Sequence, residues 1–162
     1  RRGGDAAILK KAAGVGDDLA DINPVHFRAP LAPYVAARLE GKSVSAERIL
    51  NAYRKLSLKH DFLIVEGVGG VLVPLTGNCF VADMMKWFDL PALVVTRPSL
   101  GTINHTLLTV RELSRAGVGI AGLAVNGMPR RKGPAERTNI AALAKLTGHP
   151  VLAVIPFKGN RP

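Results

Sequence analysis

Hydrophobic residues gather in four short runs along the 162-residue chain. The runs are residues 62–65, 92–96, 121–125 and 151–155, and each is nearly continuous in Val, Leu, Ile and Ala rather than alternating with polar residues. Continuous apolar runs of this length are typical of strands that are covered on both faces of a parallel sheet. We therefore expect four central strands.

Segments with helical spacing separate the later runs. Ile103, Leu107 and Val110 lie at positions i, i+4 and i+7 of a helix expected over residues 103–116, and a second helix is expected over residues 135–146. Strands that alternate with helices form right-handed βαβ units. The pattern predicts an α/β fold with a doubly wound, mostly parallel sheet and helices on both faces.

The first sixty residues have a different pattern, with three helices expected over residues 6–13, 31–39 and 46–56. Asp5 and Ser45 occupy N-cap positions, and Gly14 and Gly41 follow where a helix ends. A doubly wound nucleotide-binding domain normally starts with a strand and a glycine-rich turn. We therefore expect a single α/β domain over residues 1–162 that is incomplete at its N-terminus and at its C-terminus.

Composition places the chain among globular proteins, because 48% of its residues are hydrophobic and its mean hydropathy is +0.18. No apolar run approaches the roughly 18 residues of a membrane span, and no signal segment opens the chain, so we expect a soluble, cytoplasmic protein without a membrane partner. The single cysteine, Cys79, cannot form an internal disulfide, and we interpret it as a structural or incidental thiol rather than a reactive one.

The net charge of +10 raises the possibility of nucleic-acid binding. However, Lys and Arg are spread along the chain, and the one tight run, Arg130, Arg131 and Lys132, has no aromatic residues between its members. We expect no nucleic-acid partner and interpret this run as a solvated basic loop near an anionic nucleotide.

The strongest local motif is the segment DFLIVEGVGG at residues 61–70. An apolar strand that ends in Glu66 would place this carboxylate at the carboxyl end of the sheet, where open α/β folds bind ligands. The glycines that follow allow the backbone to pass close to a phosphate, and a carboxylate beside a nucleotide commonly holds Mg²⁺. An ordinary turn with a solvent-facing acid is the alternative interpretation.

A second motif, RPSLGTINH at residues 97–105, connects an expected strand to an expected helix. Free N–H groups at a helix start attract anions, and Thr102 or Asn104 is a candidate cap, so anion binding and simple capping both remain open. Asn126 and Pro156 each follow a strand on the ligand side of the sheet, where an Asn amide can bind an adenine edge.

The sequence contains no phosphate loop of the pattern G-x-x-x-x-G-K-[ST]. Gly41, Lys42 and Ser43 match only its last three positions, because Ala36 stands where the first glycine is required. These residues also follow an amphipathic helix rather than a strand.

Taken in order, several segments resemble dethiobiotin synthetase along essentially the whole chain. They are GDAAIL at residues 4–9, NP at 23–24, FRAPLAP at 27–33, VEGVGG at 65–70, VPL at 73–75, GTINHT at 101–106 and AVN at 124–126. The resemblance implies a domain similar to the P-loop NTPases and an ATP-dependent ligase that closes a ring by forming C–N bonds. Its substrates would be 7,8-diaminononanoate, CO₂ and ATP, its cofactor Mg²⁺, and its assembly a homodimer.

The resemblance also implies roles for particular residues. Asp5 and Glu66 would hold Mg²⁺. The ATP site would comprise Asp5, Glu66, Gly67, Val68, Gly69, Asn126, Gly127, Pro156, Phe157 and Lys158. The substrate site would comprise Pro30, Ala32, Leu100, Gly101, Thr102, Ile103 and Asn104, with Gly101 to Asn104 binding the substrate carboxylate across a dimer interface.

Departures from the family pattern limit what the chain alone can do. The phosphate loop and the catalytic lysines of the family precede the position of Asp5 and are absent, so no catalytic residue is expected here and the isolated chain should be inactive. Gly127 stands where some members have Asp. A non-catalytic remnant that binds a partner, and a related amidotransferase-type synthetase with a nucleophilic Cys, remain as alternatives.

Overall fold

The computed structural model describes residues 4–158. The chain forms two compact units, Arg1–Phe88 and Asp89–Pro162, and each is described by itself below. The organisation of the chain as a single domain stays a prediction.

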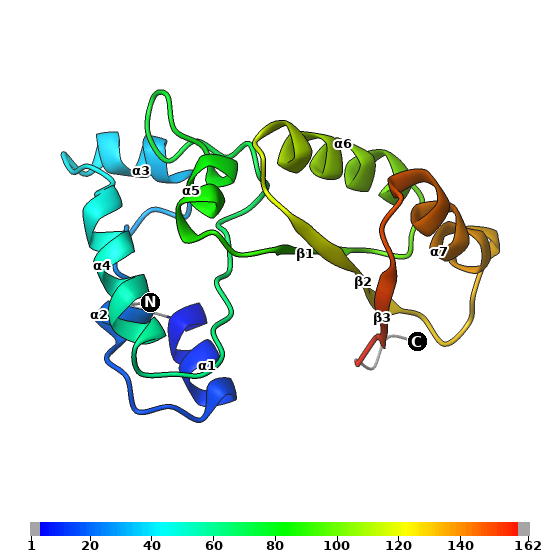
Figure 1. The fold of residues 1–162 in the computed structure, drawn as a ribbon, viewed down its shortest axis with the longest axis horizontal. Coiled ribbons are helices and arrows are strands. Elements are labelled where there is room, and N and C mark those ends of the chain that lie inside the picture. The colour runs from blue at the N-terminus through cyan, green and yellow to red at the C-terminus, as the bar shows by residue number, and fades with distance from the viewer. Residues whose placement is uncertain (1–3, 159–162) are drawn as a thin grey trace. The chain divides into compact units, whose positions relative to one another are not determined.

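The first unit is built from helices and long connections (Figure 1). Its helices are α1 (Gly4–Ala13), α2 (Leu19–Ile22), α3 (Pro33–Leu39), α4 (Ala46–Ser57) and α5 (Val81–Phe88). The three helices expected from the sequence are confirmed as α1, α3 and α4, whereas α2 and α5 were not expected.

Most of the expected helix ends are confirmed. The Ser45 hydroxyl accepts the Arg48 N–H at 3.2 Å and caps α4. Gly14 and Gly41 follow α1 and α3 with φ of +67° and +61°, a conformation that favours glycine. The expectation for Asp5 is wrong, because this residue lies inside the first turn of α1. At this position its negative charge interacts favourably with the positive end of the helix dipole, but it does not cap the helix.

A small core holds α4 and α5 together. The rings of Tyr53 and Phe88 lie 4.6 Å apart, and the Tyr53 hydroxyl donates to the Phe88 carbonyl at 3.4 Å. Val81 and Met84 of α5 are buried as well. Cys79, just before α5, is partly buried, and this burial, together with the nearby Asp83 carboxylate, raises the pKa of its thiol. A raised pKa disfavours the reactive thiolate and suits a structural thiol.

The strand expected over residues 62–65 is not present, and this prediction is wrong. The segment is irregular, and Phe62 and Ile64 are 81% and 83% exposed. A strand requires a neighbouring strand to receive its backbone hydrogen bonds. Within residues 4–158 no strand pairs with this segment, so its apolar residues do not form part of a sheet.

A charged cluster ties the loop after α1 to the end of α4. The buried Asp17 carboxylate accepts a hydrogen bond from Lys59 Nζ and lies 2.7 Å from His60 Nε2. The Asp17 carbonyl accepts a further bond from Lys10 Nζ at 2.5 Å. The bond from Lys59, with a smaller contribution from His60, lowers the pKa of the Asp17 carboxyl although burial opposes this shift.

We expect the Asp17→Asn variant to unfold at lower urea concentration than the wild type at pH 7. Because the folded state lowers the pKa of Asp17, its ionised form adds stability above the unfolded pKa of about 4, and this contribution is lost as the pH falls further. The difference between the two proteins should therefore shrink between pH 5 and pH 3. The exposed neighbour provides the control, since Asp18→Asn should show little difference at any of these pH values.

The second unit is a three-stranded parallel sheet with two helices. The strands β1 (Ala92–Thr96), β2 (Ile120–Met128) and β3 (Val151–Pro156) lie in the order β1-β2-β3, and α6 (Thr102–Arg115) and α7 (Pro134–Thr147) connect them. Three of the four expected strands and both expected helices are therefore confirmed, and the α/β class with a parallel sheet is observed.

The core of this unit lies between the sheet and its helices. Leu123, Val125 and Leu143 are completely buried, and Leu113 of α6 is 1% exposed. The Thr96 hydroxyl bonds the hydroxyls of Thr102 and Thr106 in α6, so the face that carries Thr96 faces this helix. Leu93 and Val95 alternate with these inward residues and are 53% and 61% exposed on the other face.

Gly122 in β2 has no room for a side chain. A Cβ atom there would lie 2.8 Å from the Leu152 side chain and from the Pro150 carbonyl, and the residue has φ of +154°. We expect Gly122→Ala to lower the free energy of unfolding by about 1–3 kcal/mol in urea titration, because strand β3 must move away. Gly119→Ala is the matched control, since a Cβ there meets nothing within 4 Å and should change stability by less than about 0.5 kcal/mol. Equal effects of the two substitutions would contradict this account.

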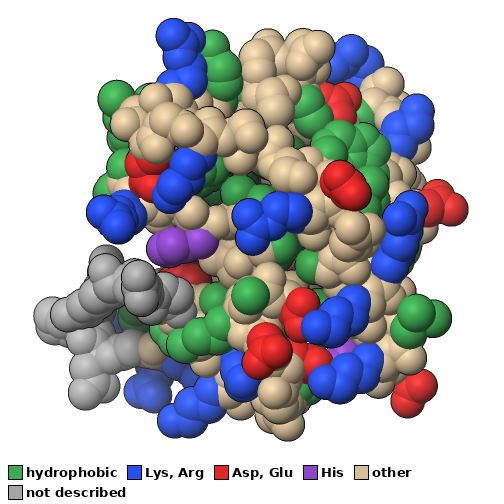
Figure 2. All heavy atoms as spheres, turned by 90° about the vertical axis from the view of Figure 1, so that its left-hand side faces the viewer, with side chains coloured by type: hydrophobic (Ala, Val, Ile, Leu, Met, Phe, Trp, Pro, Cys, Tyr) green, Lys and Arg blue, Asp and Glu red, His purple; other side chains and the backbone are tan. Residues whose placement is uncertain are grey.

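None of the helices within residues 4–158 is long and apolar enough to cross a membrane. On the face drawn in Figure 2, Lys and Arg side chains are distributed among Asp and Glu rather than gathered in one basic patch. This distribution does not favour a nucleic-acid surface on that face.

Candidate functional site

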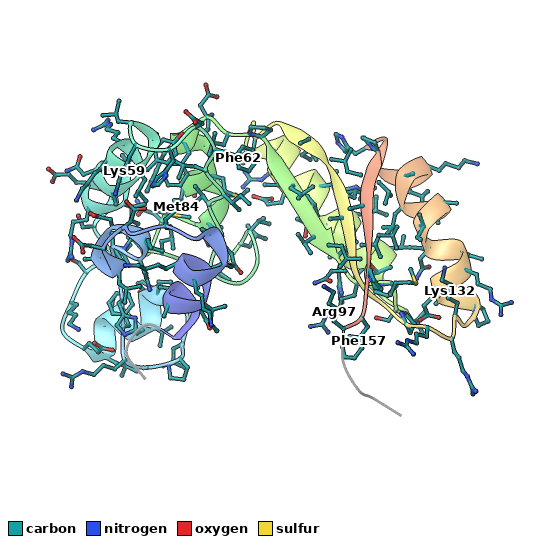
Figure 3. All side chains as sticks on the ribbon, turned by 90° about the horizontal axis from the view of Figure 1, so that it is seen from below. Lys59, Phe62, Met84, Arg97, Lys132 and Phe157 are labelled. Atoms are coloured by element: carbon teal, nitrogen blue, oxygen red, sulfur yellow. The ribbon has the colours of Figure 1, made fainter. Side chains whose placement is uncertain are left out.

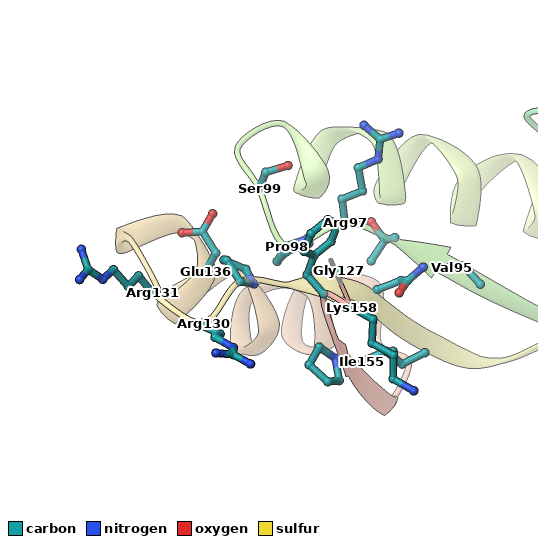
Figure 4. A pocket seen from close by; sticks show the side chains of 15 residues that line it. Val95, Arg97, Pro98, Ser99, Gly127, Arg130, Arg131, Glu136, Ile155 and Lys158 are labelled. Atoms are coloured by element: carbon teal, nitrogen blue, oxygen red, sulfur yellow. The ribbon is translucent and has the colours of Figure 1, made fainter. Parts of the chain in front are cut away.

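An open pocket of about 1830 Å³ lies at the carboxyl ends of the three strands in the second unit (Figure 4). This is the edge at which open α/β sheets bind ligands. Its lining comes from the ends of β1, β2 and β3 and from the start of α7: Val95, Thr96, Arg97, Pro98, Ser99, Asn126, Gly127, Pro129, Arg130, Arg131, Glu136, Ile155, Pro156, Phe157 and Lys158.

Buried hydrogen bonds fix the wall that follows β1. The Thr96 hydroxyl lies 2.5 Å from the Thr102 hydroxyl and 2.8 Å from that of Thr106, which anchors the strand end to α6. From α7, the buried Asn139 amide donates to the carbonyls of Pro98 and Ser99 at 2.8 and 3.3 Å. The loop that leads from β1 to α6 is therefore held in one conformation on this side of the pocket.

The ends of β2 and β3 form the floor. Asn126 pairs with Ile155 in the sheet register and points to the same face as Val95, away from Thr96 and α6. Asn126 is exposed, so its amide is open to a ligand. Gly127 has φ of +83°, and the Phe157 N–H donates to the Met128 carbonyl at 2.9 Å, which keeps the two strand ends together.

Basic side chains surround the pocket. Arg97, Arg130, Arg131 and Lys158 line it, and the one acid, Glu136, accepts the Gly133 N–H at 2.9 Å at the start of α7. Figure 4 shows the arginine side chains pointing in different directions, so they raise the local positive potential without forming one binding cluster. Such a potential attracts an anionic ligand.

The view from below separates the basic residues of this region. Figure 3 places Arg97 and Phe157 at the same end of the sheet and Lys132 further out beside α7. Of the basic run at residues 130–132, Arg130 and Arg131 line the pocket. Arg130 and Arg131 therefore lie beside a pocket, and the position of this run near a nucleotide stays a prediction.

The start of α6 differs from both caps that the sequence suggested. Gly101, with φ of +92°, occupies the N-cap position and provides no side-chain cap. Thr102 is 4% exposed and uses its hydroxyl for Thr96, so neither Thr102 nor Asn104 caps the helix. Leu100 is 93% exposed beside this turn. Leu100, Gly101, Thr102, Ile103 and Asn104 thus form a turn whose backbone N–H groups lie at a helix start.

The other expected site residues belong to the first unit. Asp5 lies in α1, Pro30 and Ala32 lie in the loop before α3, and Glu66 is exposed in the irregular segment that follows α4. Glu66 was expected at the end of a strand, and this is wrong because residues 62–65 form none. The chain bends directly after it, at a turn that contains Gly67, Val68 and Gly69.

A side chain would be tightly packed at two of these glycines. A Cβ at Gly67 would lie 3.0 Å from Val81, and one at Gly69, with φ of +70°, would lie 3.0 Å from Val73. In the described residues, no group of three His, Cys, Asp or Glu side chains is placed to hold a metal ion. Mg²⁺ usually takes only one or two protein carboxylates and keeps several waters, so the exposed acids Asp5 and Glu66 are chemically suited to it.

Of the expected ATP-site residues, the structure brings Asn126, Gly127, Pro156, Phe157 and Lys158 together in one pocket. Sequence reasoning did not assign residues 95–99, Glu136 and Ile155 to this site. A signal for the first group was present, because residues 95–99 follow the apolar run of β1 and must leave the sheet at its ligand edge.

Comparison with known proteins finds one family model that matches the chain and several similar proteins that share one name. A family described as an AAA domain matches residues 1–160. The ATP-dependent dethiobiotin synthetase BioD of Bacillus licheniformis is 42% identical over 152 residues, which cover 94% of this chain and 65% of that protein. The protein of the same name from Bacillus subtilis (strain 168) is 42% identical over 96% of this chain and 68% of its own length. The one from Anaeromyxobacter dehalogenans (strain 2CP-C) is 45% identical over 95% of this chain and 69% of its own length. The chain therefore spans about two thirds of the length of these relatives.

Proposed function

Because the chain belongs to the dethiobiotin synthetase family, we propose that it forms the larger part of an ATP-dependent ligase that makes dethiobiotin in biotin biosynthesis. The reaction joins CO₂ to the two amines of 7,8-diaminononanoate and closes a cyclic urea. The observation that carries this proposal is identity above 40% across nearly the whole chain.

The pocket of the second unit is the proposed adenine site. The exposed Asn126 amide can both donate to and accept from an adenine edge, and the ring of Phe157 beside Pro156 offers an apolar surface for the base. Gly127 and Lys158 complete this end of the proposed site. The basic lining from Arg97, Arg130 and Arg131 supports binding of a nucleotide rather than of a neutral ligand.

Asp5, Glu66 and the turn at residues 67–69 are proposed to face the phosphates. When bound, Mg²⁺ would neutralise charge that develops on the transferred γ-phosphoryl group. The carboxylates of Asp5 and Glu66 would orient this ion, directly or through water, and the glycine turn would leave space for phosphate oxygens. The phosphate-binding lysine of the family would have to come from sequence that the 162 residues do not contain.

The diamine is proposed to lie along Pro30 and Ala32, with its carboxylate at the start of α6. Backbone N–H groups of the turn at residues 100–104 would bind that carboxylate, assisted by the helix dipole. We further propose a cytoplasmic homodimer in which this turn serves the neighbouring subunit, and a doubly wound sheet in which further helices cover Leu93 and Val95.

The test uses the complete natural reading frame that contains these residues. Purified protein with 7,8-diaminononanoate, bicarbonate, ATP and Mg²⁺ should form dethiobiotin and ADP in equal amounts, measured by mass spectrometry and a coupled ADP assay. ATP turnover that depends on glutamine and yields an amide would instead indicate an amidotransferase-type synthetase. Absence of product with every component present, and with ATP bound, would indicate a non-catalytic remnant.

A further inference from the structure

Glu40 connects the end of α3 to the loop that precedes this helix. One oxygen of its carboxylate, Oε1, accepts the Arg28 N–H at 2.5 Å and the Ala29 N–H at 3.3 Å. The other oxygen, Oε2, pairs with Lys42 Nζ at 2.6 Å. A single side chain thus satisfies two backbone donors that lie eleven and twelve residues earlier in the sequence.

The environment keeps this carboxylate ionised. The side chain of Glu40 is only 15% exposed. The hydrogen bond from Lys42, supported by the two backbone N–H groups, lowers the pKa of Glu40 to about 2 although burial opposes the shift. Hydrogen bonds to an ionised acceptor are stronger than those between neutral groups, so the bonds to Arg28 and Ala29 hold this part of the loop firmly.

The loop is also fixed at its other end. The Ala36 N–H donates to the Ala32 carbonyl at 2.9 Å in the first turn of α3, and the Tyr34 N–H donates to the Pro74 carbonyl at 3.2 Å. Pro33 opens the helix at a position where its fixed φ is favourable. Only residues 30–32 therefore lie between the residues bonded to Glu40 and the start of α3. The backbone of these three residues is held at both ends.

We propose that Glu40 is a positioning residue for the diamine, acting through the loop at residues 30–32 rather than by contact with the substrate. This inference rests on the proposed function, in which Pro30 and Ala32 line the diamine site. Both oxygens of Glu40 are already bonded to donors of this chain, Arg28, Ala29 and Lys42, which is the arrangement expected of a residue that holds the loop. Its loss would leave the Arg28 and Ala29 donors without an acceptor and allow the loop to move.

The test is steady-state kinetics on the complete reading frame. Glu40→Ala should raise KM for the diamine on the order of tenfold, the size expected from loss of charge-assisted hydrogen bonds, while KM for ATP and kcat change less than about twofold. Glu40→Gln keeps an oxygen acceptor and should raise the diamine KM only about two- to threefold. Lys42→Met leaves both backbone bonds in place and should have a smaller effect than Glu40→Ala.

The control is Glu47→Ala, which removes an exposed acid from the first turn of α4 and should leave both KM values unchanged. A parallel rise of both KM values, or an unchanged diamine KM in Glu40→Ala, would overturn the proposal. If Glu40→Ala does not fold, the diamine KM values of Glu40→Gln and Lys42→Met are compared instead. The proposal then requires that Glu40→Gln raises KM for the diamine but not KM for ATP.

Amide hydrogen exchange separates this inference from the proposed function. In the wild type the amides of Arg28 and Ala29 should exchange slowly, and in Glu40→Ala they should exchange at least about tenfold faster, while the amides of α5 are unchanged. If the wild type makes no dethiobiotin, the proposed function fails regardless of Glu40. If it makes dethiobiotin and exchange at Arg28 and Ala29 is the same in both proteins, only the role of Glu40 fails.

Discussion

Replacing Glu66 by glutamine in the complete reading frame is expected to lower kcat for dethiobiotin formation by about 10²- to 10³-fold. The carboxylate is exposed and lies in an irregular segment between α4 and α5, so its loss removes a charge without disturbing a packed contact. Glutamine has nearly the same shape but binds Mg²⁺ weakly. The expected loss therefore reflects a poorly oriented ion at the phosphates rather than a change of fold.

Two measurements make this expectation specific. The variant should unfold at the same temperature as the wild type, and it should need a higher Mg²⁺ concentration for half-maximal activity. Asp61→Asn is the matched control, because Asp61 is an exposed acid at the start of the same segment and should keep activity within about twofold. A Glu66→Gln enzyme with wild-type kcat and Mg²⁺ dependence would remove Glu66 from the proposed ion site.

The sequence predicted the second unit well because its signals are local. The run at residues 92–96 forms β1 with the same limits, and the helix expected over residues 103–116 differs from α6 by one residue at each end. Continuous apolar runs and helical spacing both indicate the same elements. Asn126 and Pro156 could be placed at the ligand edge because each follows such a run.

The failure at residues 62–65 has a physical reason. The composition of this segment favours a strand, but a strand also needs a neighbouring strand to pair with. The local sequence of residues 62–65 carries no information about such a neighbour. Among residues 4–158 the segment has no strand beside it, and Phe62 and Ile64 remain exposed. Local propensity therefore did not determine its conformation.

Two helices were missed for different reasons. The four residues of α2 are too few for a periodic pattern. For α5 a signal was present, since the apolar residues Val81, Met84 and Phe88 follow helical spacing. In the structure, Asp83 of the first turn also accepts the Phe80 N–H at 2.8 Å. The Glu40 bonds could not be predicted, because the contact with Arg28 and Ala29 depends on how the chain turns between them.

The largest effect on stability is expected at the centre of the second unit. Leu123 is completely buried in β2, the middle strand, on the face that carries Val125 and meets the helices. Replacing Leu123 by alanine removes its contacts and leaves a cavity that the surrounding sheet and helices cannot readily fill. We expect the free energy of unfolding to fall by about 3–5 kcal/mol in urea titration.

Leu152→Ala provides the matched comparison, because Leu152 lies in the neighbouring strand β3 but is 58% exposed. The same change of side chain should cost less than about 1 kcal/mol there, since most of its surface already contacts water. A cost for Leu152→Ala as large as that for Leu123→Ala would mean that the Leu152 side chain is packed against other residues in solution. The pocket is built from the ends of the same strands. Leu123→Ala should therefore also weaken ATP binding. If stability falls strongly but ATP binding hardly changes, the strand ends keep their geometry after the core is weakened.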